Sequence, residues 1–445
     1  MAKPTLSIIP KVIAMKQKAD NNSKNFLRCP LEEINILDPE LLQEPHTYYD
    51  RLRDEAPIFT DPKTGIVSIA TYELIKEANS QPSIFSNDIS AMLTGDAGSD
   101  QIGSEEGEIL SQGWPIVPTL LSADPPIHTR YRKLVAKAFT SRRVNTMEDS
   151  IADLIDSLLE KILPKGECAF KLEFANLLPM YVIIDSLGAP REDIEKFRRW
   201  SDATVTMLGG VSDKAVRLQA FRDIVEFQHY LVERIEEKRS NPTEDIISDL
   251  VHADLAEEGD SRKMDYSELL SIFQQILVAG NESTANTLAE GLYRLIQNPS
   301  EMNALVNEPS QIKNFVEENL RLASPATNLW RMVKTDTTIG GVELKAGTAV
   351  LLRYGSANRD SAQFNNGQEL KVNRENAKSH IAFGYGIHAC IGSQLARKEL
   401  NLAYTKILEK MTNIKISPKQ AQIKYEPNLL VRGLSELEIT FDLRK

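Results

Sequence analysis

A short glycine-rich stretch around one cysteine constrains this chain of 445 residues more than any other part of it. It reads FGYGIHACIG at 383–392 and runs directly into a helical pattern at 393–400. Backbone N–H groups at the start of a helix favour a thiolate, the form of cysteine that binds metals. We therefore expect a loop that presents Cys390 as a metal ligand. Gly384, Gly386 and Gly392 would take backbone conformations closed to other residues, and Phe383 would cover the sulfur from one side.

Two plainer interpretations of this cysteine remain open from the residues alone. A lone cysteine beside a helix is most often a small buried hydrophobic side chain. Alternatively, His388 and Cys390 would form half of a zinc site. The other two cysteines, Cys29 and Cys168, provide no second ligand pair at zinc spacing, which argues against that alternative.

Composition narrows the class of protein. Lys and Arg number 52 against 63 Asp and Glu, so the net charge is −11, which argues against a general nucleic-acid binder. Three scattered cysteines do not form a disulfide framework and indicate a reducing compartment. No stretch approaches the roughly 18 consecutive apolar residues of a membrane span. We expect a cytoplasmic protein without a membrane span and without a nucleic-acid partner.

The periodicity of the chain predicts mostly helices. We expect a polar N-terminal extension at 1–38 and a single domain at 39–445. A helix is predicted at 39–55, a β-hairpin at 57–69, a helix at 72–78, and helices from 124 to 298. Strands are predicted at 338–342 and 348–352. Residues 86–119 contain five glycines and predict a long loop, either a functional lid or a solvated insertion.

One predicted helix is long enough to cross the whole molecule. Asp265 and Glu268 have the spacing of a capping box, and the pattern continues to about Gln297, which gives a length of roughly 50 Å. Its centre at 276–280 is apolar on all sides and should be buried. Four polar residues follow at 281–284, and polar groups within a buried helix are candidates for function. In the alternative, Glu282 lies on a solvated flank and Ser283 bonds to a carbonyl one turn earlier.

The pattern F-G-x-G-x-H-x-C-x-G, with six fixed positions in ten, resembles the haem-binding loop of the cytochrome P-450 family of haem-thiolate monooxygenases. The resemblance implies a mainly α fold with a smaller β part, with haem b between the long central helix and the cysteine loop. Cys390 would be the axial ligand of the haem iron. Phe383, Gly384 and His388 would belong to the cofactor site.

Further segments are similar to family motifs in consistent order from about residue 40 to 445. The segment DPPIHTRYRK at 124–133 resembles the one whose His128 and Arg132 reach a haem propionate. Arg331 and His380 would be further propionate partners; the alternative for His380 is a surface histidine.

Two more matches fall on the predicted helices. The segment AGNEST at 279–284 is similar to the motif in which Ala279 opens an oxygen groove, while Glu282 and Ser283 relay protons. The commonest family pattern has threonine where Ser283 stands, so Thr284 is a possible substitute. Glu318 and Arg321 match the family's E-x-x-R pair, with Arg374 as the third member of a structural network.

By this resemblance the chain is a monooxygenase that inserts one atom of O2 into a hydrophobic small molecule, by hydroxylation or epoxidation. The substrate would be a terpenoid, steroid, fatty acid or aromatic. Because the sequence has no nicotinamide, flavin or iron–sulfur motif, electrons would come from a separate ferredoxin and ferredoxin reductase. The residues expected to attract an acidic partner are Arg130, Lys133, Lys137, Arg142 and Arg143. We expect a monomer.

Two other functions stay open from the sequence. A peroxide-driven peroxygenase would not need the relay, so Glu282 and Ser283 argue against it. A non-catalytic haem-thiolate sensor or ligand carrier would bind haem and ligand without forming product.

Overall fold

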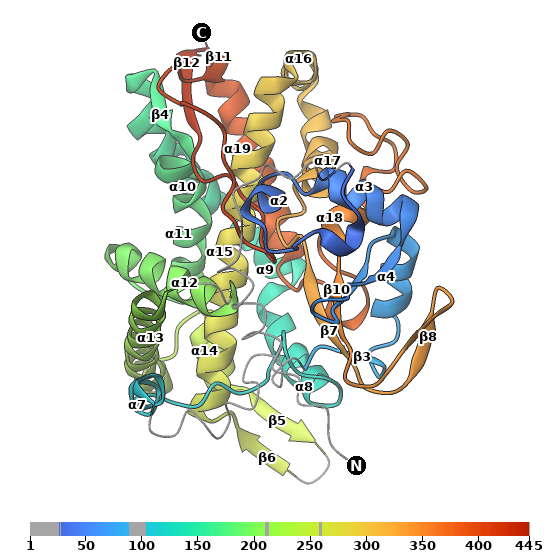
Figure 1. Ribbon diagram of the computed structural model, residues 1–445. Helices are drawn as coiled ribbons and strands as arrows, with labels where there is room; N and C mark the ends of the chain where they lie inside the picture. The colour runs from blue at the N-terminus through green and yellow to red at the C-terminus, as the bar shows by residue number, and fades with distance from the viewer. Residues whose placement is uncertain (1–25, 27, 89–103, 210–212, 258–259, 445) are drawn as a thin grey trace. The chain divides into compact units, whose positions relative to one another are not determined.

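The computed structural model describes residues 26, 28–88, 104–209, 213–257 and 260–444. Its backbone separates into two compact units. The first unit contains the described parts of Ser86–Thr140 and Met180–Asn281; the second contains those of Asp20–Phe85, Ser141–Pro179 and Glu282–Lys445. Helices dominate both units and short strands form a smaller part (Figure 1), so the predicted fold class is confirmed.

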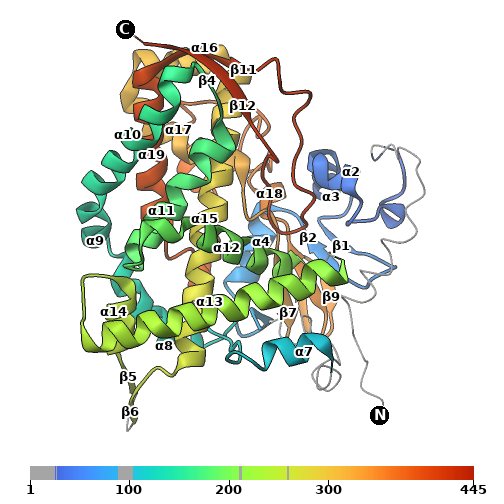
Figure 2. The same ribbon diagram turned by 90° about the vertical axis from the view of Figure 1, so that its left-hand side faces the viewer.

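The first unit is almost entirely helical. Its helices include α7 (Glu105–Leu110), α8 (Ile127–Val135), η2 (Ala136–Phe139), η5 (Arg191–Asp193), α12 (Ile194–Gly209), α13 (Lys214–Ser240) and α14 (Ile246–His252), and α11 (Leu177–Ser186) lies largely within it. Helices α12 and α13 lie side by side (Figure 2). The buried Trp200 ring lies 5.1 Å from Phe227 and 5.0 Å from Tyr230 between ring centroids, so aromatic packing joins the two helices. A hairpin of β5 (Asp254–Glu257) and β6 (Asp260–Lys263) was not predicted.

The predicted long helix is α15 (Tyr266–Gln297), which Figure 1 shows in yellow. Its capping box is present as expected. The backbone N–H of Glu268 donates to Asp265 Oδ1 at 2.9 Å, and the N–H of Asp265 donates to Glu268 Oε2 at 2.8 Å. Burial is the largest single influence on the Glu268 carboxyl and would raise its pKa, but hydrogen bonds from Arg262, Tyr131 and the Asp265 N–H together lower it to about 2. These hydrogen bonds therefore fix the position at which α15 begins.

The second unit contains a five-stranded sheet in the order β1-β2-β10-β7-β3. Its strands are β1 (Ile58–Thr60), β2 (Val67–Ile69), β3 (Phe85–Ser86), β7 (Leu329–Val333) and β10 (Ala349–Leu352). Strands β1 and β2 form the predicted hairpin, with Ile58 opposite Ile69. Strand β10 pairs with β2 in parallel and with β7 antiparallel. Because β10 is buried along its whole length, it lies at the centre of a hydrophobic core that includes Ile69, Leu352 and Phe364.

The second unit also contains helices and a smaller, three-stranded sheet. The helices and helical turns are η1 (Leu31–Glu33), α2 (Pro39–Gln43), α3 (His46–Glu55), α4 (Tyr72–Asn79), α9 (Ser141–Thr146), α10 (Glu148–Ile162), η3 (Leu163–Lys165), a π-helical turn η4 (Lys171–Ala175), α16 (Pro299–Asn307), η6 (Pro309–Gln311), α17 (Ile312–Ala323), α18 (Tyr354–Ala357), η7 (Ala377–Ser379), η8 (Gly386–His388) and α19 (Ser393–Lys410). The smaller sheet joins β11 (Met411–Ile416), β12 (Glu438–Leu443) and β4 (Glu167–Ala169). Helices α10 and α19 lie against each other (Figure 2).

Two sequence predictions about helices and strands were wrong. The helix expected at 39–55 is broken into α2 and α3, because Pro45 disfavours a helical conformation at Glu44, which has φ −138° and ψ 76°. The strand expected at 338–342 is a hairpin of β8 (Thr337–Ile339) and β9 (Val342–Leu344). It turns at Gly340 and Gly341, whose φ angles are +52° and +79°.

The loop expected at 86–119 is interrupted by α7. Ser104 caps this helix by accepting a hydrogen bond from the N–H of Gly107 at 3.0 Å, and the acidic first turn suits the helix dipole. Residues 89–103 of that predicted loop lie outside the described residues. So do 1–25 and 27 of the expected N-terminal extension. The described end of that extension buries Leu31, Ile34, Ile36 and Leu37, so packed structure begins before Pro39.

Within the described part of the chain, no helix combines the length and apolar character needed to cross a membrane.

Candidate functional site

The cysteine loop is held by its own backbone in front of α19. The N–H of Cys390 donates to the carbonyl of Phe383 at 2.7 Å. Gly384 and Gly386 have φ of +75° and +74°, as predicted. Gly392 does not, since its φ of −84° is open to any residue, so the conformational prediction for it was wrong. A Cβ at Gly392 would meet no atom within 4 Å, which shows open space beside the loop.

The plainer interpretations of Cys390 do not fit this geometry. Its side chain is exposed, so it is not a small buried hydrophobe; Cys168 has that role, and burial raises the pKa of its thiol to about 12. In the described residues, no group of three or more His, Cys, Asp or Glu side chains is arranged to hold a metal ion. The zinc alternative therefore has no ligand set in this part of the chain.

Phe383 packs against a cluster of Glu317, His380 and Arg397 that was not predicted from the sequence. The guanidinium of Arg397 lies 4.5 Å from the centre of the Phe383 ring, and the His380 ring lies 5.7 Å from it. Both side chains bind Glu317. Arg397 Nε donates to Glu317 Oε1 at 2.7 Å, and His380 Nε2 lies 3.2 Å from Glu317 Oε2. The cluster therefore fixes the ring beside the cysteine loop.

His380 is buried, so the surface alternative for it was wrong. Burial lowers the pKa of His380, although Glu317 acts in the opposite direction. Its Nδ1 accepts a hydrogen bond from the N–H of Ala382 at 3.1 Å, and Nε2 faces Glu317, so both ring nitrogens have partners. A propionate contact for His380 stays a prediction.

The E-x-x-R network is present as expected. Arg321 makes two hydrogen bonds to Glu318, at 2.7 and 2.8 Å, and Arg374 Nε donates to Glu318 Oε1 at 2.9 Å. Glu318 and Arg321 are fully buried. The remaining N–H groups of Arg374 donate to the carbonyls of Asn365, Asn366 and Glu369. This network ties α17 to the chain segment that leads into the cysteine loop.

Arg331 is a buried cation on β7. It is 4% exposed. Its guanidinium donates to Asn79 Oδ1 at 2.8 Å and to its neighbour's carbonyl, the oxygen of Trp330, at 2.7 Å. No carboxylate among the described residues forms an ion pair with it. A buried guanidinium bonded only to neutral acceptors fits an anionic group supplied by a ligand.

The predicted basic helix α8 lies within the first unit. His128 is buried, and Arg132 lies one turn later on the same face, where it is half-buried. Burial and the charge of Arg132 lower the pKa of His128, so the ring is neutral at pH 7. Lys133 and Lys137 are exposed on this segment. Only part of this helix is exposed to solvent, because the His128 side chain lies in the interior.

The polar centre of α15 is only partly buried. Ile276, Leu277 and Val278 are buried as predicted, but Ala279 is exposed. A Cβ at Gly280 would lie 2.6 Å from the Ile183 side chain, so only glycine fits without a shift there.

The predicted relay residues are accessible, not sealed in the core. Glu282 and Ser283 are half-buried, whereas Thr284 is buried. Asn286 Nδ2 donates to Glu282 Oε1 at 2.9 Å, and the Thr287 hydroxyl donates to the Ser283 carbonyl at 2.7 Å. Neither Asn286 nor Thr287 was predicted to take part. Glu282 and Ser283 are consecutive residues of the helix, so their side chains do not face each other. They can act on the same ligand only from two neighbouring faces of α15.

Comparisons with known proteins agree with this architecture. The family model for cytochrome P-450 matches residues 216–441. A steroid C26-monooxygenase of Mycobacterium tuberculosis is 33% identical over 402 residues, which are 90% of this chain and 94% of that protein. The vitamin D(3) 25-hydroxylase of Pseudonocardia autotrophica is 31% identical, covering 93% of this chain and 98% of that protein.

Solved structures show the same fold. CYP109Q5 from Chondromyces apiculatus has a TM-score of 0.79 at 30% identity, covering 93% of this chain and all of that one. CYP109E1 from Bacillus megaterium, in complex with testosterone, has a TM-score of 0.76 at 31% identity, covering 89% and 99% of the two chains. This chain belongs to the cytochrome P-450 family, and it is an oxidoreductase of the monooxygenase class.

Membership of this family implies a haem-thiolate iron, with O2 and a small-molecule substrate as reactants. The residues present fit such a group. Cys390 is exposed on its loop, and Arg331 is a buried cation that forms no ion pair with a carboxylate in the described part of the chain.

Proposed function

We propose that Cys390 is the axial thiolate ligand of haem b and that Phe383, Gly384 and His388 belong to its cofactor site. The observation that carries this proposal is the exposed cysteine on a short loop directly before α19. The start of a helix favours the thiolate over the thiol. When bound, the haem supplies the oxygen-activating chemistry, which a thiolate ligand promotes by donating electron density.

Arg331, His128 and Arg132 are proposed to bind the haem propionates. The support for Arg331 is its burial without a carboxylate partner, and the support for His128 and Arg132 is their common face on α8. Since the pKa of His128 is lowered, its neutral ring would donate one hydrogen bond and Arg132 would supply the charge. Replacing Arg331 with Leu should weaken haem retention, measured as the rate of haem transfer to an apo-globin acceptor. An unchanged transfer rate would contradict the assignment.

For proton delivery we propose that Ala279 borders the oxygen site, that Glu282 is the acid and that Ser283 is the alcohol. Glu282 is half-buried and held by Asn286, so it has both access to water and a fixed position. Thr284 is the substitute alcohol, although its burial makes it the weaker candidate. Ser283→Ala should uncouple electron consumption from product formation more than Thr284→Ala does. The reverse order would assign the relay to Thr284.

The reaction we propose is hydroxylation or epoxidation of a hydrophobic small molecule, with steroids and secosteroids as the first class to test. Terpenoids, fatty acids and aromatics remain in the panel. The support is the names of the relatives, a steroid C26-monooxygenase and a vitamin D(3) 25-hydroxylase, and the testosterone complex of CYP109E1.

A Soret-band titration of the purified protein against the four compound classes tests the substrate. The class that displaces water from the iron should shift the band toward the high-spin form. That compound, incubated with NADPH, a ferredoxin and a ferredoxin reductase, should then yield an oxygenated product. A spectral shift without any product would favour the alternative of a haem-thiolate sensor or ligand carrier. Product formed with hydrogen peroxide alone, at the same rate, would favour a peroxygenase.

We further propose a separate ferredoxin as electron donor, and a monomeric, cytoplasmic enzyme in which both units act as one monooxygenase domain. The sequence lacks a flavin or nicotinamide motif, and Lys133, Lys137 and Arg142 are exposed. All three cysteines lie in the described part of the chain, and no disulfide joins any of them. Lys133→Glu and Lys137→Glu should slow reduction by ferredoxin and flatten its dependence on salt, whereas Lys345→Glu, an exposed lysine on the loop after β9, should not.

A further inference from the structure

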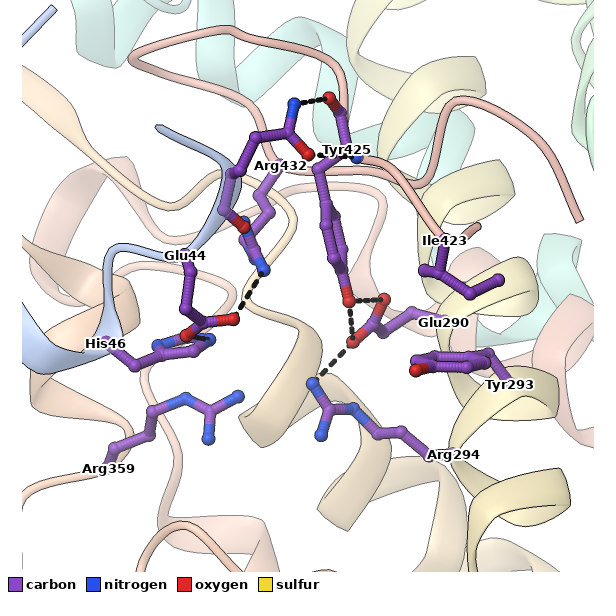
Figure 3. Close-up of a pocket in the computed structure, with 10 residues that line it drawn as sticks. Glu44, His46, Glu290, Tyr293, Arg294, Arg359, Ile423, Tyr425 and Arg432 are labelled. Carbon is purple, nitrogen blue, oxygen red and sulfur yellow. Dashed lines mark hydrogen bonds and ion pairs between the residues drawn. The ribbon is translucent and has the colours of Figure 1, made fainter. Parts of the chain in front are cut away.

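A pocket of about 410 Å³ in the second unit has no part in the proposed monooxygenase site. It lies between the start of α3, the last turns of α15, the turn after α18 and the chain segment at 423–432 (Figure 3). These segments are far apart in the sequence. They bring three arginines and two glutamates to the pocket: Arg294, Arg359, Arg432, Glu44 and Glu290.

The charges in this pocket do not balance. Glu290 forms an ion pair with Arg294 and accepts hydrogen bonds from the Tyr425 hydroxyl at 3.2 and 3.1 Å. Arg432 lies 3.9 Å from Glu44. Arg359 is left without a carboxylate among the described residues. Three guanidinium groups against two carboxylates leave one formal positive charge.

The unbalanced cation is also the most deeply buried one. Arg359 is 4% exposed, and it donates to Gln368 Oε1 at 2.6 Å and to the Leu322 carbonyl at 2.9 Å. Its Nε is buried and has no hydrogen-bond partner in the part of the chain that the structure describes. Burial, followed by the charges of Arg294 and other nearby arginines, lowers the pKa of Arg359 well below its usual range. A buried charge in this state is costly unless an anion compensates it.

Two further unpartnered nitrogen atoms belong to the same pocket. Nε of Arg294 and Nδ1 of His46 are both buried, and neither has a hydrogen-bond partner within the described ranges of the chain. Burial and the neighbouring arginines lower the pKa of His46, so its ring is neutral and carries one N–H. Figure 3 shows the guanidinium groups of Arg294 and Arg359 pointing toward one another, with His46 beside Arg359. Native proteins rarely leave several buried polar nitrogen atoms around one cavity unsatisfied.

Apart from the polar side chain of Gln43, the rest of the wall is apolar or aromatic. The ring of Tyr425 is stacked on Arg432, with the guanidinium carbon 3.6 Å from the ring centre. Tyr293 and Ile423 line the pocket on the side of Tyr425 away from His46 (Figure 3). The pocket therefore offers charged donors for a head group and flat apolar surface for a body.

We propose that this pocket binds a small organic monoanion, a carboxylate whose head lies between Arg359, Arg294 and His46 and whose aromatic or aliphatic body lies against Tyr425. The planar fork of arginine matches a carboxylate in shape and charge. One net positive charge calls for one negative charge, and a dianion such as phosphate would face Glu290. The volume also exceeds what a bare inorganic anion fills.

Isothermal titration calorimetry of the haem-loaded full-length protein with sodium benzoate, at low ionic strength, tests this proposal. We expect one benzoate per chain and no change of the Soret band, because the pocket is not the proposed haem site. Arg294→Gln and His46→Leu should each weaken binding about tenfold, as expected when one charge-assisted or buried hydrogen bond is lost. The matched control is Arg239→Gln, an arginine on α13 that pairs with Glu236 one turn away.

Circular dichroism and the Soret band establish that each variant is folded before its titration. No heat of binding in the wild-type protein would overturn the proposal, as would equal affinity in the wild-type protein and in both pocket variants. Stronger binding of inorganic phosphate than of benzoate would overturn the choice of an organic monoanion. A Soret shift that follows the heat of binding would place benzoate at the haem and would also contradict the proposal. The proposal is supported if Arg239→Gln keeps the wild-type affinity for benzoate while both pocket variants lose affinity.

Discussion

Two adjacent glutamates on α17 hold two different parts of the second unit. Glu318 binds Arg321 and Arg374 in an environment that excludes water, since the side chains of Glu318 and Arg321 are 0% exposed. Glu317 binds His380 and Arg397, and the side chain of Arg397 is 29% exposed. Both carboxylates have two cationic or polar partners. They differ in whether water can replace a lost partner.

This difference separates a structural network from a positioning one. Removing a partner from the closed Glu318 network leaves a buried charge that nothing else can satisfy. The Glu317 cluster is nearer to solvent, and its partners stack on Phe383 beside Cys390. We therefore expect changes at Glu318 to affect folding, and changes at Glu317 to affect the surroundings of the cysteine loop as well.

The largest effect should come from Glu318→Gln. The amide keeps the shape but leaves two buried guanidinium groups without a countercharge, which should lower the free energy of unfolding by about 3–5 kcal/mol. Urea unfolding followed by circular dichroism measures the loss. Glu409→Gln, at an exposed position of α19, is the control and should change stability by less than about 0.5 kcal/mol. Equal stability of the two variants would show that the network is not structural.

A smaller loss, about 1–3 kcal/mol, should follow Glu317→Gln. Desolvation alone would raise the pKa of Glu317, but hydrogen bonds from His380 and Arg397 hold it at about 2, below the usual 4.5. The ionised carboxylate therefore stabilises the fold above about pH 4.5, and this stabilisation is lost as the pH falls toward 2.

The wild-type protein should thus lose stability over that pH range more steeply than Glu317→Gln. The Soret band of the variant should also shift at neutral pH, because Phe383 is no longer fixed. Parallel stability curves with an unchanged Soret band would contradict a positioning role for Glu317.

The smallest effect in this series should come from a carboxylate that only caps a helix. Asp265→Ala removes the acceptor for the Glu268 N–H and should cost about 1 kcal/mol. The midpoint of urea unfolding measures it, and amide hydrogen exchange should show faster opening of the first turn of α15 alone. If Asp265→Ala lowered the free energy of unfolding as much as Glu318→Gln does, the proposed difference between a buried ion-pair network and an exposed helix cap would be wrong.

The features that sequence reasoning found are local ones. The capping box, the apolar stretch of α15 and the glycines at 384 and 386 lie within a few residues of the groups they serve, so their spacing alone indicates them. The break at Pro45 was also local and was overlooked. The E-x-x-R pair is local, but its third member, Arg374, came from resemblance to the family.

The features that were missed depend on tertiary contacts. Glu317 meets His380 and Arg397 across 63 and 80 residues of chain, and no periodicity connects them. The pocket around Arg359 gathers side chains from four distant segments. Strands β4 and β5 are short and lie among helical patterns, so their partners decide their conformation. Exposure of Ala279 likewise depends on what surrounds α15, which the pattern does not show.

The most direct test of the whole account is the Soret band of the reduced, carbon monoxide-bound protein, compared between the wild type and Cys390→His. We expect the long-wavelength band of thiolate ligation in the wild type and in the control Cys29→Ser. In Cys390→His we expect the shorter-wavelength band of histidine ligation in its place. A long-wavelength band that persists without Cys390, or is absent from the wild-type protein, would contradict the claim that this loop supplies the thiolate of a cytochrome P-450.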